Sequence, residues 1–287
     1  MSIVLENISY TYMRGTPFER RALADVSLTI EEGSFTALAG HTGSGKSTLV
    51  QHLNGLLQPD GGTVRVDGTD IAAKGAEAKK ARQSVGMVFQ YPEHQLFEET
   101  VAKDVAFGPL RLGLSPEETE ERVRAALDFV GLPVDEFGAR SPFALSGGER
   151  RRAAIAGVLA LAPRYLVLDE PTAGLDPRAS AALLARLCEL HEKEGVTIIL
   201  VSHNMDDIAR FADRLIVMHE GSVALEGAPR EVFFAGEKLK EAGLRPPHIV
   251  ELLEALREKG LVLDPAAFEA ADGAARIVEA LRRRASC

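Results

Sequence analysis

Short apolar runs alternate with longer amphipathic stretches along most of the chain. These runs are apolar throughout, which is typical of strands that are buried on both faces of a sheet. The clearest examples span residues 35–39, 85–89, 165–168, 196–201 and 215–218. Because helical patterns separate them, the sequence predicts an α/β fold with a mostly parallel core sheet.

Two further patterns adjoin this core. Short strand-like runs punctuated by glycine, such as residues 62–67, predict a small antiparallel β subdomain in the first third of the chain. Residues 91–163 are mostly helical, and we interpret them as a helical subdomain inserted into the core fold. Within it, Ser115-Pro116-Glu117-Glu118 has the signature of a helix start, and Gly131 is a fitting helix end.

The last part of the chain, from about residue 228, is rich in helical patterns. Ile249, Leu252, Leu253 and Leu256 form one apolar stripe that stops at Gly260. Such a stripe fits a helix that packs on its own domain, and it also fits a surface for dimerisation or for another partner. We therefore divide the chain into a main unit over residues 1–227 and a C-terminal helical region over residues 228–287, for which dimerisation is a hypothesis.

Composition narrows the possible functions. The 287 residues carry 33 basic and 42 acidic side chains, a formal net charge of −9, so the chain has no overall basic footprint for nucleic acid. The longest apolar run, near residues 153–162, is about half of the roughly 20 residues that a membrane helix needs, and the first residues resemble a strand and not a signal peptide. Cys188 and Cys287 form neither a metal-binding spacing nor a disulfide framework. Any membrane role is therefore expected to come from partner proteins.

The most specific motif stands between the predicted strand 35–39 and a helical pattern over residues 48–57. It fits G-x-x-x-x-G-K-[ST] and consists of Gly40, His41, Thr42, Gly43, Ser44, Gly45, Lys46, Ser47 and Thr48. Glycines allow backbone N–H groups to surround a phosphate, and the following helix directs its positive end at the same group. We expect Lys46 to reach the β- and γ-phosphates and Ser47 to give its hydroxyl to Mg²⁺.

Two carboxylates, Asp169 and Glu170, directly follow the apolar run 165–168. The carboxyl ends of parallel strands line the ligand crevice of such sheets. We expect Asp169 to hold Mg²⁺, and Glu170 to orient or deprotonate a water that attacks a phosphate. Without other motifs, this pair could equally be the solvated acidic end of a strand. The phosphate loop in the same chain argues against that alternative.

Four more features stand where nucleotide chemistry would use them. Gln90 follows the run 85–89, where a side-chain amide suits Mg²⁺ or the attacking water, and His203 follows the run 196–201, a position suited to sensing a γ-phosphate. Taken singly, a Gln or a His is more often structural. The run 145–149, Leu-Ser-Gly-Gly-Glu, is a second glycine-rich turn before a helix and hence a second anion site. Ala-Gly-Leu-Asp, ending at Asp176, follows the carboxylate pair.

In their order and spacing, these motifs closely resemble the ABC transporter ATPase family over about residues 3–230. The resemblance implies a P-loop cassette that hydrolyses ATP with Mg²⁺ in a head-to-tail dimer. Each ATP would lie between the phosphate loop of one chain and the Leu-Ser-Gly-Gly signature of the other. Residues implied to serve the partner's nucleotide are Ser146, Gly147 and Gly148.

The same resemblance implies further nucleotide contacts. An aromatic side chain near the N-terminus would stack on adenine, and Tyr12 is the candidate, with Tyr10 as the alternative. The resemblance also makes Asp176 a candidate nucleotide-binding residue. Glu149 departs from the family, which commonly has Gln at the end of the signature.

Within the family, several segments resemble the ATPases of energy-coupling factor transporters, especially their second ATPase subunit. They are residues 16–19, 22–23, 90–97, 100–101, 104–109, 154–160 and 202–207. This resemblance implies uptake of a vitamin or a transition-metal ion, with the chain bound peripherally at the cytoplasmic face of the cell membrane. The implied partners are a second ATPase subunit (the same or a paralogous chain), a membrane coupling protein and a substrate-binding membrane subunit.

Two other functions compete with this one. A soluble ABC ATPase of DNA repair or translation usually has long coiled-coil insertions or two cassettes, whereas this chain has one cassette and no long heptad run. The second alternative is a cassette that binds ATP but does not hydrolyse it, and the presence of Glu170 and His203 argues against it. For the transport hypothesis, the acidic segment 92–104, directly after Gln90, is the expected docking surface of the coupling protein.

Overall fold

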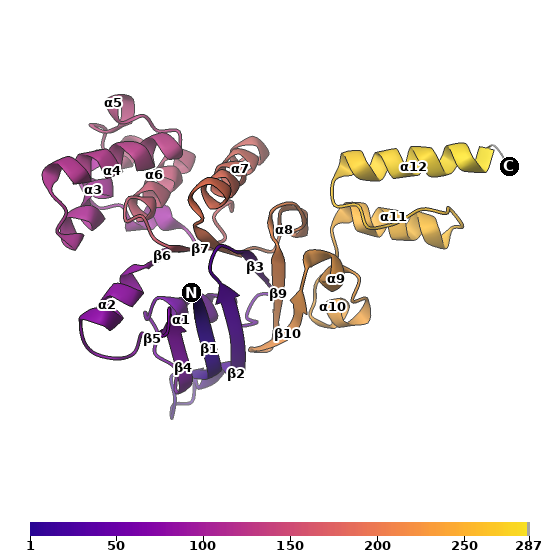
Figure 1. Ribbon diagram of the computed structural model, residues 1–287, viewed down its shortest axis with the longest axis horizontal. Coiled ribbons are helices and arrows are strands. Elements are labelled where there is room, and N and C mark those ends of the chain that lie inside the picture. Colours follow the sequence, from indigo (N-terminus) through magenta and orange to yellow (C-terminus); the bar gives the residue numbers. More distant parts are fainter. Residues whose placement is uncertain (286–287) are drawn as a thin grey trace.

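The computed structural model describes residues 1–285 and contains two sheets, of which the antiparallel one lies at the edge of the molecule (Figure 1). Cys287 lies outside the described residues. The core sheet has the order β10-β9-β3-β8-β7-β6, in which only β10 is antiparallel to its neighbour. Its strands are β3 (Phe35–Ala39), β6 (Val85–Val88), β7 (Tyr165–Asp169), β8 (Thr197–Val201), β9 (Arg214–His219) and β10 (Ser222–Gly227). The predicted mostly parallel core is confirmed.

The second sheet is antiparallel, with the order β2-β1-β4-β5. Its strands are β1 (Ser2–Tyr12), β2 (Arg20–Glu31), β4 (Gly61–Val66) and β5 (Thr69–Asp70), which is the predicted β subdomain. Helix α1 (Lys46–Leu53) shares one apolar cluster with strand residues of both sheets. The prediction that this helix extends to residue 57 was wrong, because the chain turns at Gly55, which has a φ of +76°.

The helical subdomain leaves the core sheet after β6 and returns before β7. Its elements are η1 (Pro92–Gln95), α3 (Val101–Leu112), α4 (Pro116–Phe129), α5 (Val134–Phe137), η2 (Pro142–Ala144) and α6 (Gly147–Leu159). The predicted helix start is a capping box: the Glu118 N–H donates to the Ser115 hydroxyl (3.2 Å), and the Ser115 N–H donates to the Glu118 carboxylate (2.9 Å). Apolar residues of α3, α4 and α6 form one core with the sheet and with α7 (Pro177–Glu194). Helix α2 (Ala76–Gln83) precedes β6.

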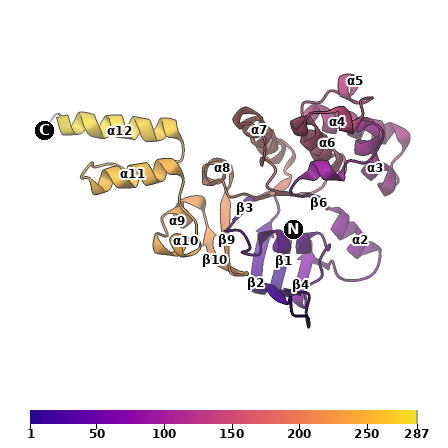
Figure 2. The same cartoon turned by 180° about the vertical axis from the view of Figure 1, so that it is seen from behind.

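The C-terminal region divides into two parts. Helices α9 (Pro229–Phe233) and α10 (Glu237–Glu241) pack with α8 (Met205–Phe211) on strands β3 and β9 of the core. Helices α11 (His248–Glu258) and α12 (Ala270–Ala285) lie side by side and project from one end of the molecule (Figures 1 and 2). The division of the chain at residue 228 stays a prediction. Helices α9 and α10 follow that residue but pack against the main unit.

The apolar stripe of α11 faces two ways. Leu253 is buried and Ile249 lies against Gly273 of α12, where an added Cβ would come within 2.3 Å of the isoleucine side chain, so any larger residue would force that side chain to move. Leu252 on α11 and Val278 and Leu281 on α12 are about half exposed. The stripe thus packs within the chain, and a second use in dimerisation stays a prediction. Within residues 1–285, none of the helices has the length and apolar character needed to cross a membrane.

Candidate functional site

The phosphate loop joins β3 to α1 at the carboxyl edge of the core sheet. Gly45 has a φ of +105°, and a Cβ there would lie 2.7 Å from the carbonyl oxygen of Ala22, so the tight turn requires glycine. The Lys46 ammonium lies inside the loop and donates to the carbonyls of Gly40 (2.7 Å) and His41 (3.0 Å). Burial lowers the pKa of Lys46, and the nearby carboxylates oppose that shift. The loop therefore holds a cation at the place where phosphates would bind.

Asp169 ends β7 directly beside this loop. Its side chain is buried, and burial raises the pKa of Asp169, while a hydrogen bond from the Ser47 hydroxyl lowers it. A hydroxyl and a carboxylate at one point are the protein ligands that Mg²⁺ takes when phosphates and waters complete its shell. Among residues 1–285 no three His, Cys, Asp or Glu side chains gather as a metal cage. The residues present therefore fit Mg²⁺ bound together with a nucleotide.

Glu170 has a left-handed backbone, with a φ of +53°. The Glu170 amide donates to the Val201 carbonyl (3.0 Å). The Glu170 carboxylate accepts a hydrogen bond from Nδ1 of His203 at 2.9 Å. Two successive carboxylates thus have different partners, which separates a metal-binding role from a proton-accepting one.

A cavity of about 280 Å³, here called the phosphate cavity, brings most of the predicted residues together. Its lining consists of Tyr12, Arg20, Ala22, Thr42, Gly43, Gly45, Lys46, Ser47, Thr48, Gln90, Asp169 and Glu170. The Tyr12 hydroxyl lies 3.2 Å from the hydroxyl of Thr48. Tyr10 packs edge-on between Tyr12 and His52 and does not line the cavity. Of the two candidates for adenine stacking, Tyr12 is the one placed beside the phosphate loop.

Other predicted residues lie outside this lining. Gly40, His41 and Ser44 belong to the loop, but the His41 ring packs against His219 with centroids 5.3 Å apart. His203 is largely exposed and reaches the cavity through Glu170. Asp176 caps α7 by accepting hydrogen bonds from the N–H groups of two residues of its first turn. Its nucleotide contact stays a prediction.

Ser146 begins α6, as the second glycine-rich turn predicted. The Ser146 N–H donates to the Glu149 carboxylate (2.7 Å), and the Glu149 N–H donates to the Ser146 hydroxyl (3.3 Å). These hydrogen bonds lower the pKa of Glu149. The residue that departs from the family therefore completes a capping box that fixes the signature turn.

Gly147 and Gly148 line a second cavity of about 520 Å³, here called the signature cavity. The sequence did not point to the ion pair at its base, where buried Arg151 on α6 contacts Glu93 at 3.3 Å and lies over the ring of Tyr91. Arg151 is the middle one of three successive arginines at the start of α6, and nothing in the sequence distinguished it from its two neighbours. The signature cavity and the phosphate cavity share no lining residue.

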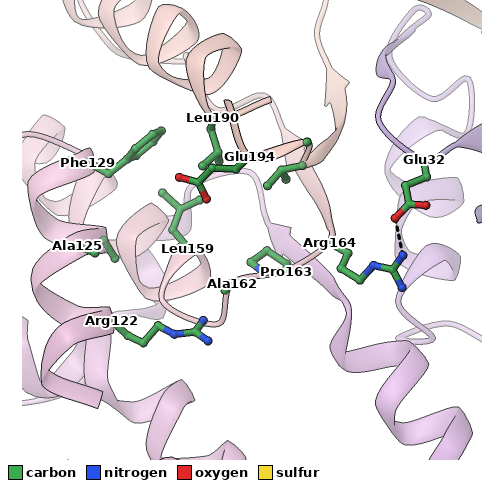
Figure 3. A pocket seen from close by; sticks show the side chains of 13 residues that line it. Glu32, Arg122, Ala125, Phe129, Leu159, Ala162, Pro163, Arg164, Leu190 and Glu194 are labelled. Atoms are coloured by element: carbon green, nitrogen blue, oxygen red, sulfur yellow. Dashed lines mark hydrogen bonds and ion pairs between the residues drawn. The ribbon is translucent and has the colours of Figure 1, made fainter. Parts of the chain in front are cut away.

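A third cavity of about 500 Å³ lies between α4, the end of α6 and the end of α7 (Figure 3). Phe129, Leu159 and Leu190 form its apolar wall, and Arg164 at one side is paired with Glu32. None of the predicted site residues lines it. It is therefore separate from the nucleotide site.

Comparison with known proteins agrees with this geometry. The family model described as ABC transporter matches residues 23–173. The energy-coupling factor transporter ATP-binding protein EcfA2 of Clostridium tetani is 51% identical over 260 residues, covering 91% of this chain and 90% of that protein. The protein of the same name from Clostridium perfringens is 49% identical over 282 residues, covering 98% and 99%.

Solved structures are similar as well. CbiO1 of Clostridium perfringens, described as part of the ABC transporter complex cbiONQ, has a TM-score of 0.72 and 39% identity, covering 88% of this chain and 98% of that one. The ATP-binding cassette MJ0796, solved as a dimer in a post-hydrolysis state with ADP and Pi, has a TM-score of 0.71 and 32% identity, covering 79% and 98%. With its phosphate loop, carboxylate pair and signature in place, the chain belongs to the ABC transporter ATPases, a family characterised by ATP hydrolysis, and within it to the ATP-binding subunits of energy-coupling factor transporters.

Proposed function

We propose that this chain hydrolyses ATP in a head-to-tail dimer and so drives uptake of a vitamin or a transition-metal ion through partner membrane subunits. The observation that carries the proposal is the separation of the phosphate cavity from the signature cavity, which have no lining residue in common. A single chain holds both halves of a composite ATP site, the phosphate loop and the signature turn, but the two halves line different cavities. A second ATPase chain, the same or a paralogue, would complete each half.

The residues of the phosphate cavity support a stepwise role in hydrolysis. The loop N–H groups and Lys46 bind the phosphates, and Tyr12 stacks on adenine. Mg²⁺, held by Ser47 and Asp169 with Gln90 nearby, supplies positive charge to the phosphate oxygens when bound. Glu170 accepts the proton of the attacking water as the new P–O bond forms and the bond to ADP breaks. His203 orients the Glu170 carboxylate through the hydrogen bond between them.

Docking of a membrane coupling protein is assigned to the segment after Gln90. Most acidic groups there already have partners: Glu93 contacts Arg151, Glu99 contacts Lys103, and the Asp104 carboxylate accepts the N–H groups of residues 97 and 98. The Glu98 side chain makes no hydrogen bond within residues 1–285, and the neighbouring Phe97 is 57% exposed. An acidic group beside an exposed ring suits a partner helix that carries arginine and apolar anchors. Such docking would hold the chain at the cytoplasmic face of the cell membrane.

The test is purification of the tagged chain from its native membranes, followed by identification of every copurified subunit. We expect an ATPase partner, a membrane coupling protein and a small substrate-binding membrane protein, together with Mg²⁺-dependent ATP hydrolysis by the complex. The Glu170→Gln chain should recover the same subunits and lack the hydrolysis, which makes it the matched control. Recovery with ribosomes or DNA and without membrane proteins would instead favour a soluble ATPase of translation or DNA repair.

A further inference from the structure

We propose that Arg20 is a nucleotide-binding residue whose guanidinium binds the phosphate chain of ATP from the β1–β2 hairpin. The inference deepens the proposed function and rests on it. Arg20 begins β2 and pairs directly with Tyr12 at the end of β1. Both side chains line the phosphate cavity. The hairpin thus presents an aromatic ring and a cation side by side to one ligand.

The Arg20 guanidinium lies directly over the phosphate loop. A Cβ at Gly43 would be 2.8 Å from Nη2 of Arg20, and Gly43 has a φ of +84°. The backbone conformation favours glycine here, and the missing side chain leaves the space that the arginine occupies. Because the loop N–H groups surround the phosphates, a cation held against Gly43 faces the same groups.

The charge on Arg20 is not neutralised by the protein. Across residues 1–285 its side chain makes no hydrogen bond and no ion pair. The adjacent Glu19 turns the other way, and its carboxylate accepts the N–H of Gly15 at 2.7 Å. The Thr16 hydroxyl further orders this turn by donating to the Met13 carbonyl at 2.7 Å. The acid of the hairpin is thus engaged elsewhere and does not neutralise Arg20.

The charges that line the phosphate cavity also favour a phosphate contact for Arg20. Its charged lining residues are two cations and two carboxylates, namely Arg20, Lys46, Asp169 and Glu170. Without Arg20, this lining would carry net negative charge beside a polyanionic ligand, which raises the electrostatic cost of binding. A guanidinium also presents a planar fork of donors that matches phosphate oxygens. The structure therefore assigns Arg20 a phosphate ligand and not an adenine or ribose ligand.

The next residue provides a matched control. Arg21 points to the opposite face of the strand, as successive strand residues do. Its guanidinium donates to the Leu23 carbonyl (3.3 Å) and to the Ser9 hydroxyl (3.4 Å). It has the same charge and lies in the same strand, and it does not line the phosphate cavity.

The test compares Arg20→Ala, Arg20→Lys, Arg21→Ala and Tyr12→Ala for binding of ATP and of inorganic tripolyphosphate. Displacement of a fluorescent ATP analogue, with Mg²⁺ present, gives both affinities. We expect Arg20→Ala to weaken both ligands about tenfold or more, since hydrogen bonds to charged groups are the strong ones. Arg20→Lys should recover part of the loss because it keeps the charge without the fork. Tyr12→Ala should weaken ATP and spare tripolyphosphate, and Arg21→Ala should match the wild type for both.

Two results would overturn the inference. If Arg20→Ala bound tripolyphosphate as well as the wild type did, Arg20 would act only by supporting Tyr12. If Arg21→Ala lost as much affinity as Arg20→Ala, the effect would come from general charge on the hairpin. The Arg20→Lys chain keeps the test usable if the alanine variant folds poorly, since full wild-type affinity with an ammonium in place of the fork would also contradict a bidentate contact. A wild-type chain that binds tripolyphosphate but not ATP would overturn the proposed function instead.

Discussion

The phosphate cavity and the signature cavity belong to one chain and contain different chemistry. The first gathers Lys46, Asp169 and Glu170 around a glycine loop, so it can bind a phosphate and activate a water. The second gathers the glycines at the start of α6 with arginines and exposed aromatic rings, and its carboxylate, Glu93, is already paired with Arg151. The difference teaches that the groups able to act on a phosphate and the glycines of the signature turn lie on separate surfaces of the same molecule.

Two short chain segments connect these cavities. Gln90 lines the phosphate cavity and the next residue, Tyr91, lines the signature cavity. Likewise, Glu170 lines the phosphate cavity, and Ala173, three residues later, lines the signature cavity. A change at the phosphates therefore has a short covalent path to the signature side, and substitutions on either side can test how independent the two cavities are.

The largest expected effect is that of Glu170→Gln in the phosphate cavity. The amide still orients a water but cannot accept its proton, so ATP hydrolysis should fall on the order of 10²–10⁴-fold while ATP binding persists. Phosphate release measures the first quantity, and an ATP-dependent doubling of mass on size exclusion measures the trapped dimer. Glu194→Gln, on the exposed end of α7, is the control and should behave as the wild type. Near-normal turnover by Glu170→Gln would remove this residue from its role.

Lys46→Ala should act one step earlier. It removes the ammonium that the loop carbonyls hold at the phosphate position, so we expect ATP affinity to fall about tenfold or more. Equilibrium binding of a fluorescent ATP analogue measures this loss. Lys193→Ala, a surface lysine paired with Glu189, is the control. Unchanged affinity in Lys46→Ala would contradict the assignment of the phosphate loop.

Linked dimers test directly whether the two cavities combine across chains. With Lys46→Ala in one chain and Ser146→Arg in the other, both lesions fall in one composite site, and the second site stays intact. With both lesions in the same chain, each composite site has one lesion. We expect the first arrangement to keep part of the ATPase activity and the second to lose it. Equal activity of the two arrangements would argue that each chain has a self-contained site.

The smallest expected effect on hydrolysis comes from the docking segment. Glu98→Lys with Glu99→Lys should leave the ATPase rate of the isolated chain within a few fold, because neither side chain lines the phosphate cavity. The same change should weaken capture of the membrane coupling protein, since like charges across a docking site can cost several kcal/mol. Pull-down and ATPase rate are measured on one preparation. Glu121→Lys with Asp128→Lys, two exposed acids of α4, is the matched control, and equal capture by both variants would place the docking surface elsewhere.

Local signals in the sequence were enough for the strands of the core and for the position of the phosphate loop between β3 and α1. Apolar runs gave the parallel strands within one or two residues, and Ser115 with Glu118 gave a helix start that the structure confirms. Both depend on residues close together in the chain, so they can be seen without the fold.

Contacts between distant segments could not be predicted in this way. The pair of Arg151 and Glu93 joins residues 58 positions apart, and Arg20 reaches Gly43 only because β1, β2 and the loop assemble. The role of Glu149 as a cap was also missed, although the Ser-x-x-Glu spacing was visible in the sequence. This cap is a local contact, since the two residues stand three positions apart.

The left-handed backbone of Glu170 places the stability of the fold in conflict with the rate of ATP hydrolysis. A non-glycine residue in this conformation costs on the order of 1–2 kcal/mol, so replacement by glycine would relieve strain and also remove the general base. A library of variants sorted only for resistance to heat would therefore enrich inactive chains at this position. Thermostable forms of this ATPase are better sought on the exposed helices, with residue 170 held fixed, because the strain at Glu170 is part of what separates the two carboxylates.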